Sequence, residues 1–287
     1  MTSSVAHAAG AAAEAAARAA GAQVRELSTH EELDAVCEMF IDVWHPEPKD
    51  PLMTSDLLRA LKLAGSYISG AFDASGLIGA CVGFFGAPAS NCLHSHITGV
   101  SAAGQGRGVG FALKLHQRAW SLAHDIAIVA WTFDPLIRRN AYLNLVKLAA
   151  SGDEYFTNFY GNMRDELNGS DDSDRLLVNW HLASPAVAAA CAGTPTPADA
   201  HAEHAAGAGV ALRATAEGRP MLGSDDGETL LVAVPPDIEV TRTRDPACAR
   251  SWRVAVRETL GALLHCGAHV SGFDPAGWYV VRRGDEQ

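Results

Sequence analysis

Apolar residues recur along the first half of the chain with helical spacing in some segments and in strand-like runs in others. A strand is predicted at 24–27, and Ser28 with Glu31 fits a capping box at the start of a helix that runs to about Val43. Thr54 is the expected N-cap of a second helix. The further elements predicted in this half are helix 55–64, strands 67–72 and 77–85 joined by a short turn, strand 92–100, helix 109–124 and strand 126–133.

The second half shows the same alternation with one long interruption. A helix is predicted at 137–149, followed by strands at 155–160 and 175–181. From 184 to 228 the composition shifts to Ala, Gly, Pro, Thr and His without a regular period, which indicates a linker or long loop. After it the pattern predicts strand 229–234, amphipathic helix 246–266 and a hairpin at 269–273 and 278–282.

The first 22 residues are rich in alanine. The stretch AAAEAAARAA favours a helix, but alanine buries little area and short helices are marginal in water. We therefore expect residues 1–22 to be a frayed helix or a disordered tail. The segment also lacks the basic start and leucine-rich core of a signal peptide.

The order of elements, in which predicted helices and strands are mixed along the chain, predicts an α/β (α+β) protein. We expect the main domain to span 23–183, after the N-terminal tail of 1–22. The linker of 184–228 then leads to a C-terminal strand–helix–hairpin module, 229–287. This module either extends the main sheet or forms a small second unit.

Composition changes the picture mainly by what it excludes. The 287 residues carry a net charge of −11, and a surface so acidic repels nucleic acid and anionic lipid. We expect neither as a partner, and no apolar stretch is long enough for a transmembrane helix. The six cysteines form no CxxC pair, which argues against a zinc ribbon or a disulfide scaffold. The default compartment is a reduced cytoplasm.

One glycine-rich segment, 97–115, carries candidate chemistry. A strand ends, glycines follow at 104, 106 and 108, and a helix begins. The free N–H groups and positive dipole of a helix start bind anions, and glycine lets a phosphate approach the backbone. Arg107 adds a positive charge. The segment predicts a phosphate site, most economically for a pyrophosphate, although it has neither a Walker loop nor the GxGxxG spacing.

The spacing Gln105-x-x-Gly108-x-Gly110 resembles the [RQ]xxGxG/A pyrophosphate loop of the GCN5-related N-acetyltransferase (GNAT) superfamily. Val100, five residues before the glutamine, matches the usual strand end of that family. The order of elements over roughly 23–182 agrees as well. The resemblance implies a GNAT-like fold with a mixed, mostly antiparallel central sheet flanked by helices. The stretches WTFDPLIRRNAYLNLVKL, YGNMRDELNG and DSDRLLVNW look like an uncharacterised branch of predicted acetyltransferases within the superfamily.

The resemblance implies that acetyl-CoA is the co-substrate and that an acetyl group moves to an amine, on an acceptor we expect to be a small molecule. The pantetheine arm would pair with the backbone of Ile97, Thr98, Gly99 and Val100. The pyrophosphate would bind the backbone N–H groups of Gln105, Gly106, Arg107, Gly108, Val109 and Gly110. Arg138 and Asn140, at the start of the next predicted helix, are candidates to hold the CoA arm or an acceptor carboxylate; a solvated helix face is the alternative for Arg138.

The chain departs from the family pattern in that helix. Ala141 fits the expected alanine, but Arg138 takes the place of the usual asparagine. Leu145 takes the place of the tyrosine thought to protonate the leaving CoA thiolate. Asn144 and Tyr142 are the candidate substitutes for this general acid.

Amine acetylation also needs a group that accepts a proton from the acceptor. His94 and His96 alternate along the predicted strand 92–100 and therefore share one face. A histidine near its reference pKa can act as a base at neutral pH, and a packed, hydrogen-bonded role is the alternative. Asp134 is a second candidate base, with a helix-capping role as its alternative.

Other activities remain as alternatives to an N-acetyltransferase. They are a non-catalytic CoA-binding module, which the missing tyrosine favours, and another CoA-dependent reaction such as O-acyl transfer. A metal site is not expected, because the HxH pair at 94 and 96 has no third ligand at a persuasive spacing. The sequence does not identify the acceptor, and it leaves open a homodimer.

Overall fold

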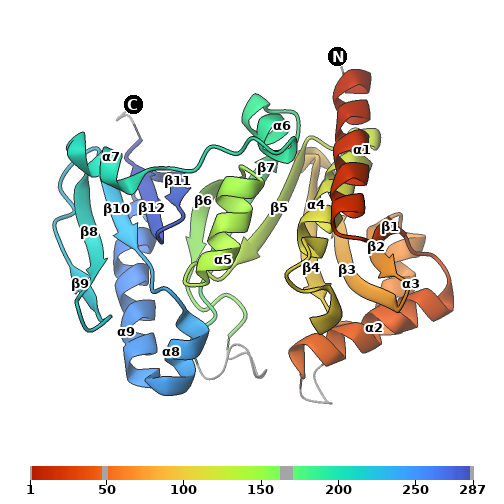
Figure 1. Ribbon diagram of the computed structural model, residues 1–287, viewed down its shortest axis with the longest axis horizontal. Helices are drawn as coiled ribbons and strands as arrows, with labels where there is room; N and C mark the ends of the chain where they lie inside the picture. The colour runs from red at the N-terminus through yellow and green to blue at the C-terminus, as the bar shows by residue number, and fades with distance from the viewer. Residues whose placement is uncertain (1, 47–50, 162–170, 285–287) are drawn as a thin grey trace. The chain divides into compact units, whose positions relative to one another are not determined.

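The computed structural model describes residues 2–46, 51–161 and 171–284 (Figure 1). Most of the segment YGNMRDELNG lies outside these described residues. The chain divides into two compact units, one of residues 1–131 with 181–192 and one of residues 132–180 with 193–287. The domain boundaries expected at 183/184 and 228/229 do not coincide with this division.

Unit 1 is a sheet in the order β1-β2-β3-β4-β5 with helices on both faces. Neighbouring strands are antiparallel except for β4 and β5, which run parallel. The strands are β1 (Gln23–Glu26), β2 (Tyr67–Asp73), β3 (Gly76–Phe85), β4 (Cys92–Val100) and β5 (Ile128–Phe133). The helices are α1 (Thr2–Ala19), α2 (His30–Trp44), α3 (Ser55–Leu63), α4 (Val109–Ala123) and α6 (Pro185–Cys191).

The start of α2 corrects one prediction. The capping box is formed by Thr29 and Glu32, one residue later than the predicted pair of Ser28 and Glu31. The N–H of Glu32 donates to Oγ1 of Thr29 at 3.2 Å, and the N–H of Thr29 donates to the Glu32 carboxylate at 3.1 Å. Both registers place a hydroxyl residue three positions before a glutamate, so the sequence alone does not choose between them. The predicted cap of α3, Thr54, is confirmed.

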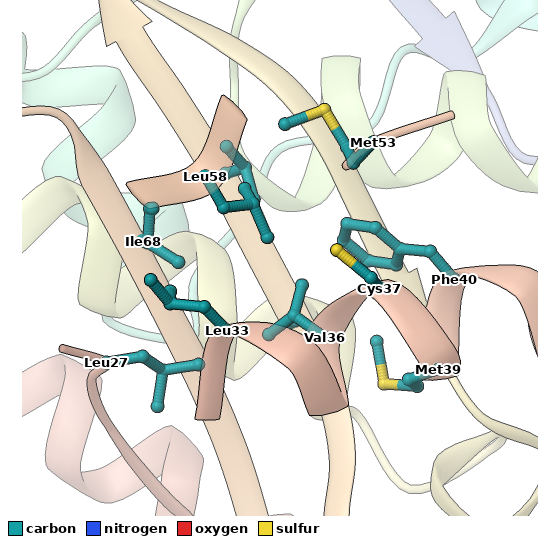
Figure 2. Close-up of a cluster of buried hydrophobic side chains, with 11 residues drawn as sticks. Leu27, Leu33, Val36, Cys37, Met39, Phe40, Met53, Leu58 and Ile68 are labelled. Atoms are coloured by element: carbon teal, nitrogen blue, oxygen red, sulfur yellow. The ribbon is translucent and has the colours of Figure 1, made fainter. Parts of the chain in front are cut away.

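One apolar core of unit 1 lies where α2 and α3 pack on β2 and β3. Figure 2 shows Leu33, Val36 and Phe40 of α2 pointing toward Leu58 of α3 and Ile68 of β2. These five side chains are almost fully buried. The apolar residues that recur with helical spacing in the sequence therefore form the face of α2 that covers this side of the sheet.

Helix α1 packs against α4 instead of forming a frayed or disordered tail (Figure 1). Ala9, Ala13 and Ala17 recur at intervals of four residues and are buried. Small side chains let two helices approach closely. The many van der Waals contacts along the stripe therefore compensate for the small area that each alanine buries. The prediction of a frayed helix or disordered tail is therefore wrong, because a continuous stripe of alanines buries more than any single alanine does.

Unit 2 contains a sheet in the order β7-β6-β11-β12-β10-β8-β9. Its strands are β6 (Ser151–Phe156), β7 (Arg175–His181), β8 (Gly209–Ala214), β9 (Pro220–Leu222), β10 (Thr229–Ala233), β11 (His269–Asp274) and β12 (Trp278–Arg282). Its helices are α5 (Arg138–Ala141), α7 (Ala200–Ala205), α8 (Ile238–Arg244), α9 (Pro246–Val256) and α10 (Ala262–His265), with π-helical stretches η3 (Tyr142–Lys147) and η4 (Arg257–Gly261).

Several predictions for unit 2 needed correction. Strand β6 begins at Ser151, four residues before its predicted start at Tyr155. The predicted linker contains α7, β8 and β9 as well as α6 of unit 1, and α8 was not predicted. Strand β11 pairs with β6 at Val270 and Gly152, so the C-terminal module extends the sheet that holds β6 and β7.

The predicted fold class, a mixed and mostly antiparallel sheet flanked by helices, is confirmed. Most strand pairs in both units are antiparallel; β4 with β5 and β8 with β10 are parallel. Within the described ranges, no helix combines the length and apolar character needed to cross a membrane.

The packing of α1 yields a stability prediction. Ala13→Glu places a charge in the buried α1–α4 contact, and we expect it to lower the free energy of unfolding by about 2–4 kcal/mol. Ala15→Glu adds the same residue on the exposed side of the same helix and should cost no more than about 0.5 kcal/mol. Urea unfolding followed by circular dichroism measures both. Equal, small losses would show that α1 does not pack as described.

Candidate functional site in unit 1

The feature that defines the site is the early end of the pairing between β4 and β5. The two strands pair only at Cys92–Ile128, Leu93–Val129 and His94–Ala130. On its other side β4 stays paired with β3 as far as Val100. Among the described strand pairs, residues 95–100 therefore have no partner on the side away from β3, and we call this side of β4 the open edge.

A bulge in β4 shapes the open edge. Ile97 pairs with Val82 and Ser95 pairs with Gly83, which leaves His96 as the extra residue. The bulge interrupts the alternation of side chains, so Ser95 and Thr98, three positions apart, both contact Cys81 of β3. Bulges re-aim side chains and expose backbone groups, which suits a strand that receives an extended ligand.

The open edge leads directly into the predicted phosphate loop. The loop turns back on β3, because the N–H of Ser101 donates to the carbonyl of Ile78 at 3.0 Å. Gly106 and Gly108 have φ angles of +73° and +85°, which side chains disfavour. Gly108 is the N-cap of α4 and no side chain caps this helix start. The first turn of α4 thus offers backbone donors and the positive end of its dipole to an anion.

Arg107 has a different environment from the one expected. Its guanidinium donates to the carboxylate of Asp73 at 2.6 Å and to the carbonyl oxygens of Ala20, Gly21 and Ala103 at 3.1 Å each. These acceptors lie after the end of α1, at the end of β2, and in the loop itself. Arg107 therefore links the loop to the end of α1 and to the end of β2, and its charge is already matched by Asp73.

His94 and His96 lie close together, on either side of Ser95. Their ring centroids are 6.1 Å apart and both rings contact Phe84, at 5.1 and 5.5 Å. Desolvation by the surrounding protein lowers the pKa of both rings, and the nearby His96 and Lys114 lower that of His94 further. Both imidazoles are therefore neutral at pH 7, the form that accepts a proton.

A buried polar cluster under β4 has no counterpart among the residues singled out from the sequence. The ammonium of Lys114 donates to Oγ of Ser95 at 2.7 Å and to Oε1 of Gln117 at 3.2 Å. It also lies 3.8 Å from the ring centroid of Trp131. Lys114 was missed because a lysine in an amphipathic helix normally faces solvent. The sequence signal was its place among apolar neighbours in GFALKL.

The candidate residues of the predicted helix 137–149 lie in unit 2. Nε of Arg138 donates to the carbonyl of Pro275 at 2.9 Å, in the turn between β11 and β12. Asn140 and Tyr142 are partly exposed, and the Asn144 side chain is buried. Tyr142 and Asn144 belong to the π-helical stretch η3, whose wider turn the sequence does not reveal. Leu145, at the position of the missing tyrosine, is buried.

Asp134 lies at the centre of an ion-pair cluster in unit 2. Its carboxylate accepts two hydrogen bonds from Arg253, both at 2.8 Å, and one from Arg242 at 2.6 Å. Burial alone raises a carboxyl pKa, but the two arginines hold the pKa of Asp134 well below its ordinary value. Asp171 accepts from the same arginines. This geometry favours a structural role for Asp134 over the role of base.

The neighbouring arginine of α9 and η4 completes the cluster. Arg257 pairs with Asp174 at 2.8 Å and with Asp172 at 2.6 Å, and the Tyr155 hydroxyl also donates to Asp174. Arg253 and Arg257 thus pair with aspartates from other segments of unit 2. Within the ranges the structure describes, no group of three His, Cys, Asp or Glu side chains is arranged to hold a metal ion.

Comparisons with solved structures find similar chains. An N-acetyltransferase from Staphylococcus aureus Mu50 is 15% identical, with a TM-score of 0.46 over 56% of this chain and 98% of that one. The ribosomal-protein-S5-alanine acetyltransferase from Vibrio fischeri is 14% identical, with a TM-score of 0.47 over 57% of this chain and 94% of that one.

A third similar chain is a phosphinothricin acetyltransferase of the GNAT superfamily from Sinorhizobium meliloti, solved in complex with AcCoA. It is 14% identical, with a TM-score of 0.44 over 55% of this chain and 87% of that one. No protein-family model matches the sequence, and no curated protein matches it.

The lowered histidine pKa values yield a pH prediction. Because the pKa of His94 is lower in the folded chain, the unfolded chain binds more protons just below pH 6.5. The contribution of His94 to the free energy of unfolding is therefore present above that pH and lost as the pH falls. We expect His94→Gln to make the free energy of unfolding depend less steeply on pH between about pH 5 and 7. Urea unfolding at several pH values measures the slope, and a slope equal to that of the wild type would contradict the described burial of His94.

The environment of Asp134 yields a second prediction. Asp134→Asn removes the charge that faces two buried arginines, and we expect a loss of about 3 kcal/mol or more in unfolding free energy. Asp172→Asn removes a carboxylate that is 44% exposed and should cost no more than about 1 kcal/mol. Thermal and urea unfolding compare the two variants. A stable Asp134→Asn protein that is nevertheless inactive would restore Asp134 as a catalytic candidate.

Proposed function

We propose that this chain is a GNAT-type acyltransferase that binds acetyl-CoA in unit 1 and transfers the acetyl group to an amine of a small-molecule acceptor. The observation that carries the proposal is the open edge of β4, which leads without interruption into a loop with positive-φ glycines and an uncapped helix start. Such a site suits a ligand in which an extended, thiol-bearing arm is joined to a pyrophosphate: the arm fits the open edge and the pyrophosphate fits the loop.

The open edge supplies strand-like hydrogen bonding for the pantetheine arm. Backbone groups of Ile97, Thr98, Gly99 and Val100 have no strand partner on this side, and only Gly99 is buried. An added Cβ at Gly99 would lie 2.8 Å from Trp44 and 3.0 Å from Phe40, so glycine is required there by packing on α2. The other three residues, Ile97, Thr98 and Val100, are partly exposed.

The loop supplies the pyrophosphate site through backbone N–H groups. The cofactor-binding residues we propose here are Gln105, Gly106, Arg107, Gly108, Val109 and Gly110. Arg107 contributes by position, since its guanidinium already holds Asp73 and three carbonyl oxygens. An uncharged cradle of amides can bind a pyrophosphate on a protein whose net charge is −11.

In the reaction the acceptor amine attacks the thioester carbonyl, and the C–S bond breaks with its electron pair on sulfur. His94 and His96 are neutral groups beside the open edge and are our candidates to take the proton that the amine loses. Holding both substrates at one strand supplies much of the rate. Arg138 and Asn140 stay candidates to hold the CoA arm or an acceptor carboxylate. Tyr142 and Asn144 stay candidates for the proton returned to sulfur.

A non-catalytic CoA-binding module is the second candidate function. It is favoured by Leu145, an apolar and buried residue where the resemblance places a proton donor. The two functions differ in acceptor-stimulated release of free thiol from acetyl-CoA. Tight CoA binding without such release across a broad panel of amines would favour the module, and release with hydroxyl acceptors alone would indicate O-acyl transfer.

Two glycines with the same backbone geometry provide a matched test of the site. Gly108 and Gly65 have φ angles of +85° and +82°, and an added Cβ meets no atom within 4 Å at either position. Gly108→Asp places a negative charge at the proposed phosphate site and should weaken CoA binding at least about tenfold. Gly65→Asp carries the same backbone strain and charge at the end of α3 and should leave CoA binding unchanged. Isothermal titration calorimetry measures both; equal affinities would overturn the site.

A further inference from the structure

The ammonium of Lys114 is a buried cation that has no carboxylate partner among the described residues. The residue is 5% exposed, and its contacts are Ser95, Gln117 and the ring of Trp131. Among the residues the structure describes, no Asp or Glu contacts it. A desolvated charge that is not matched by an opposite charge is costly, and such groups concentrate at functional sites.

The position of this cation is as informative as its burial. Pairing between β4 and β5 ends at His94 and Ala130, and the next residue on each strand is Ser95 and Trp131. Lys114 contacts both of these residues at once, from helix α4. The side chain therefore lies at the point where the two strands stop pairing, which is where the open edge begins.

The surroundings of Lys114 are built to hold it there. Gln117 accepts from the ammonium through Oε1, and its Nε2 lies 3.4 Å from the sulfur of Cys81. Thr98 of the open edge donates to the same sulfur at 3.2 Å. The network thus connects α4 to both sides of the β4 bulge. The phosphate loop leads into the first turn of the same helix.

We propose that Lys114 is a positioning residue of the acyl-transfer site, which holds the ends of the β4–β5 pairing apart and places a positive charge behind the open edge. This inference rests on the proposed function. During transfer, negative charge develops on the thioester oxygen and then on the CoA sulfur, and a desolvated cation fixed nearby stabilises that charge. Lys114 keeps its proton throughout; the amine's proton leaves through another group.

Burial gives this role a pH dependence. Desolvation lowers the pKa of Lys114 to about 8, so the cation is lost on the alkaline side of neutrality. The titratable groups that face it are Cys81 from β3 and His94 from β4. Helix α1, which also packs against α4, pairs its Glu14 and Arg18 with each other at the surface. Activity should therefore decline above about pH 8 as Lys114 loses its proton.

The test compares acetyl-transfer kinetics of the wild type and Lys114→Met across pH 6–10, with an amine found active in the thiol-release assay. We expect kcat to fall at least about tenfold at pH 7 in the variant, KM for acetyl-CoA to change less, and the alkaline decline near pH 8 to disappear. Lys62→Met is the control, because Lys62 lies on α3 and pairs with Glu26; its profile should match the wild type. Nuclear magnetic resonance titration of the Lys114 side chain provides a readout without turnover.

The possible outcomes separate this inference from the proposed function. A wild-type chain that neither binds nor turns over acetyl-CoA overturns both. A wild type that is active, with a folded Lys114→Met variant that keeps the same kcat and alkaline decline, overturns the role of Lys114 alone. Should Lys114→Met fail to fold, Ser95→Ala decides. A loss of kcat with a displaced alkaline decline supports the role, and an unchanged profile overturns it.

Discussion

The constraint on which the site depends is that two parallel strands stop pairing after three residues. Strand β4 continues for six residues beyond His94, fixed on one side by β3 and unpaired on the other among the described strands. Backbone groups left in this way must find a partner, and a ligand that mimics a strand supplies one. The bulge at His96 lies two residues beyond this point, and the buried Lys114 contacts Ser95, the residue that follows His94.

The loop after β4 depends on a second fastening, the guanidinium of Arg107. It joins the carbonyls after α1 to the phosphate loop and to Asp73 of β2. Because α1 in turn packs on α4 through its alanine stripe, an N-terminal segment with little side-chain area fixes the start of the helix that would bind the pyrophosphate. The loop is thus ordered when the unit folds, so that it loses little conformational entropy when a ligand binds. Such preorganisation favours tight binding.

Helices and strands whose apolar residues recur regularly along the sequence were predictable. Features that depend on contacts between distant segments were not. The bounds of β4 and β7, the hairpin of β2 and β3, and the cap of α3 follow from local pattern and were predicted. The capping box of α2 was one residue off, because two overlapping registers have the same chemistry. The salt-bridge partners of Asp134 lie on a segment distant in sequence, and the π-helical turn at Tyr142 has no local signal. The burial of Lys114 also depends on a distant strand, and its local sign is its place among apolar neighbours in GFALKL.

Two buried charges in this chain show how compensation separates structure from chemistry. Asp134 pairs with two arginines that also pair with Asp171. These ion pairs keep Asp134 ionised, and its charge stabilises the fold. Lys114 meets a hydroxyl, an amide oxygen and an aromatic ring, which orient the ammonium without neutralising it. An orienting shell that leaves charge unmatched preserves a field that a reacting group can use, whereas a matched pair cancels it. The same distinction explains how a chain of net charge −11 presents a locally positive environment at one strand edge.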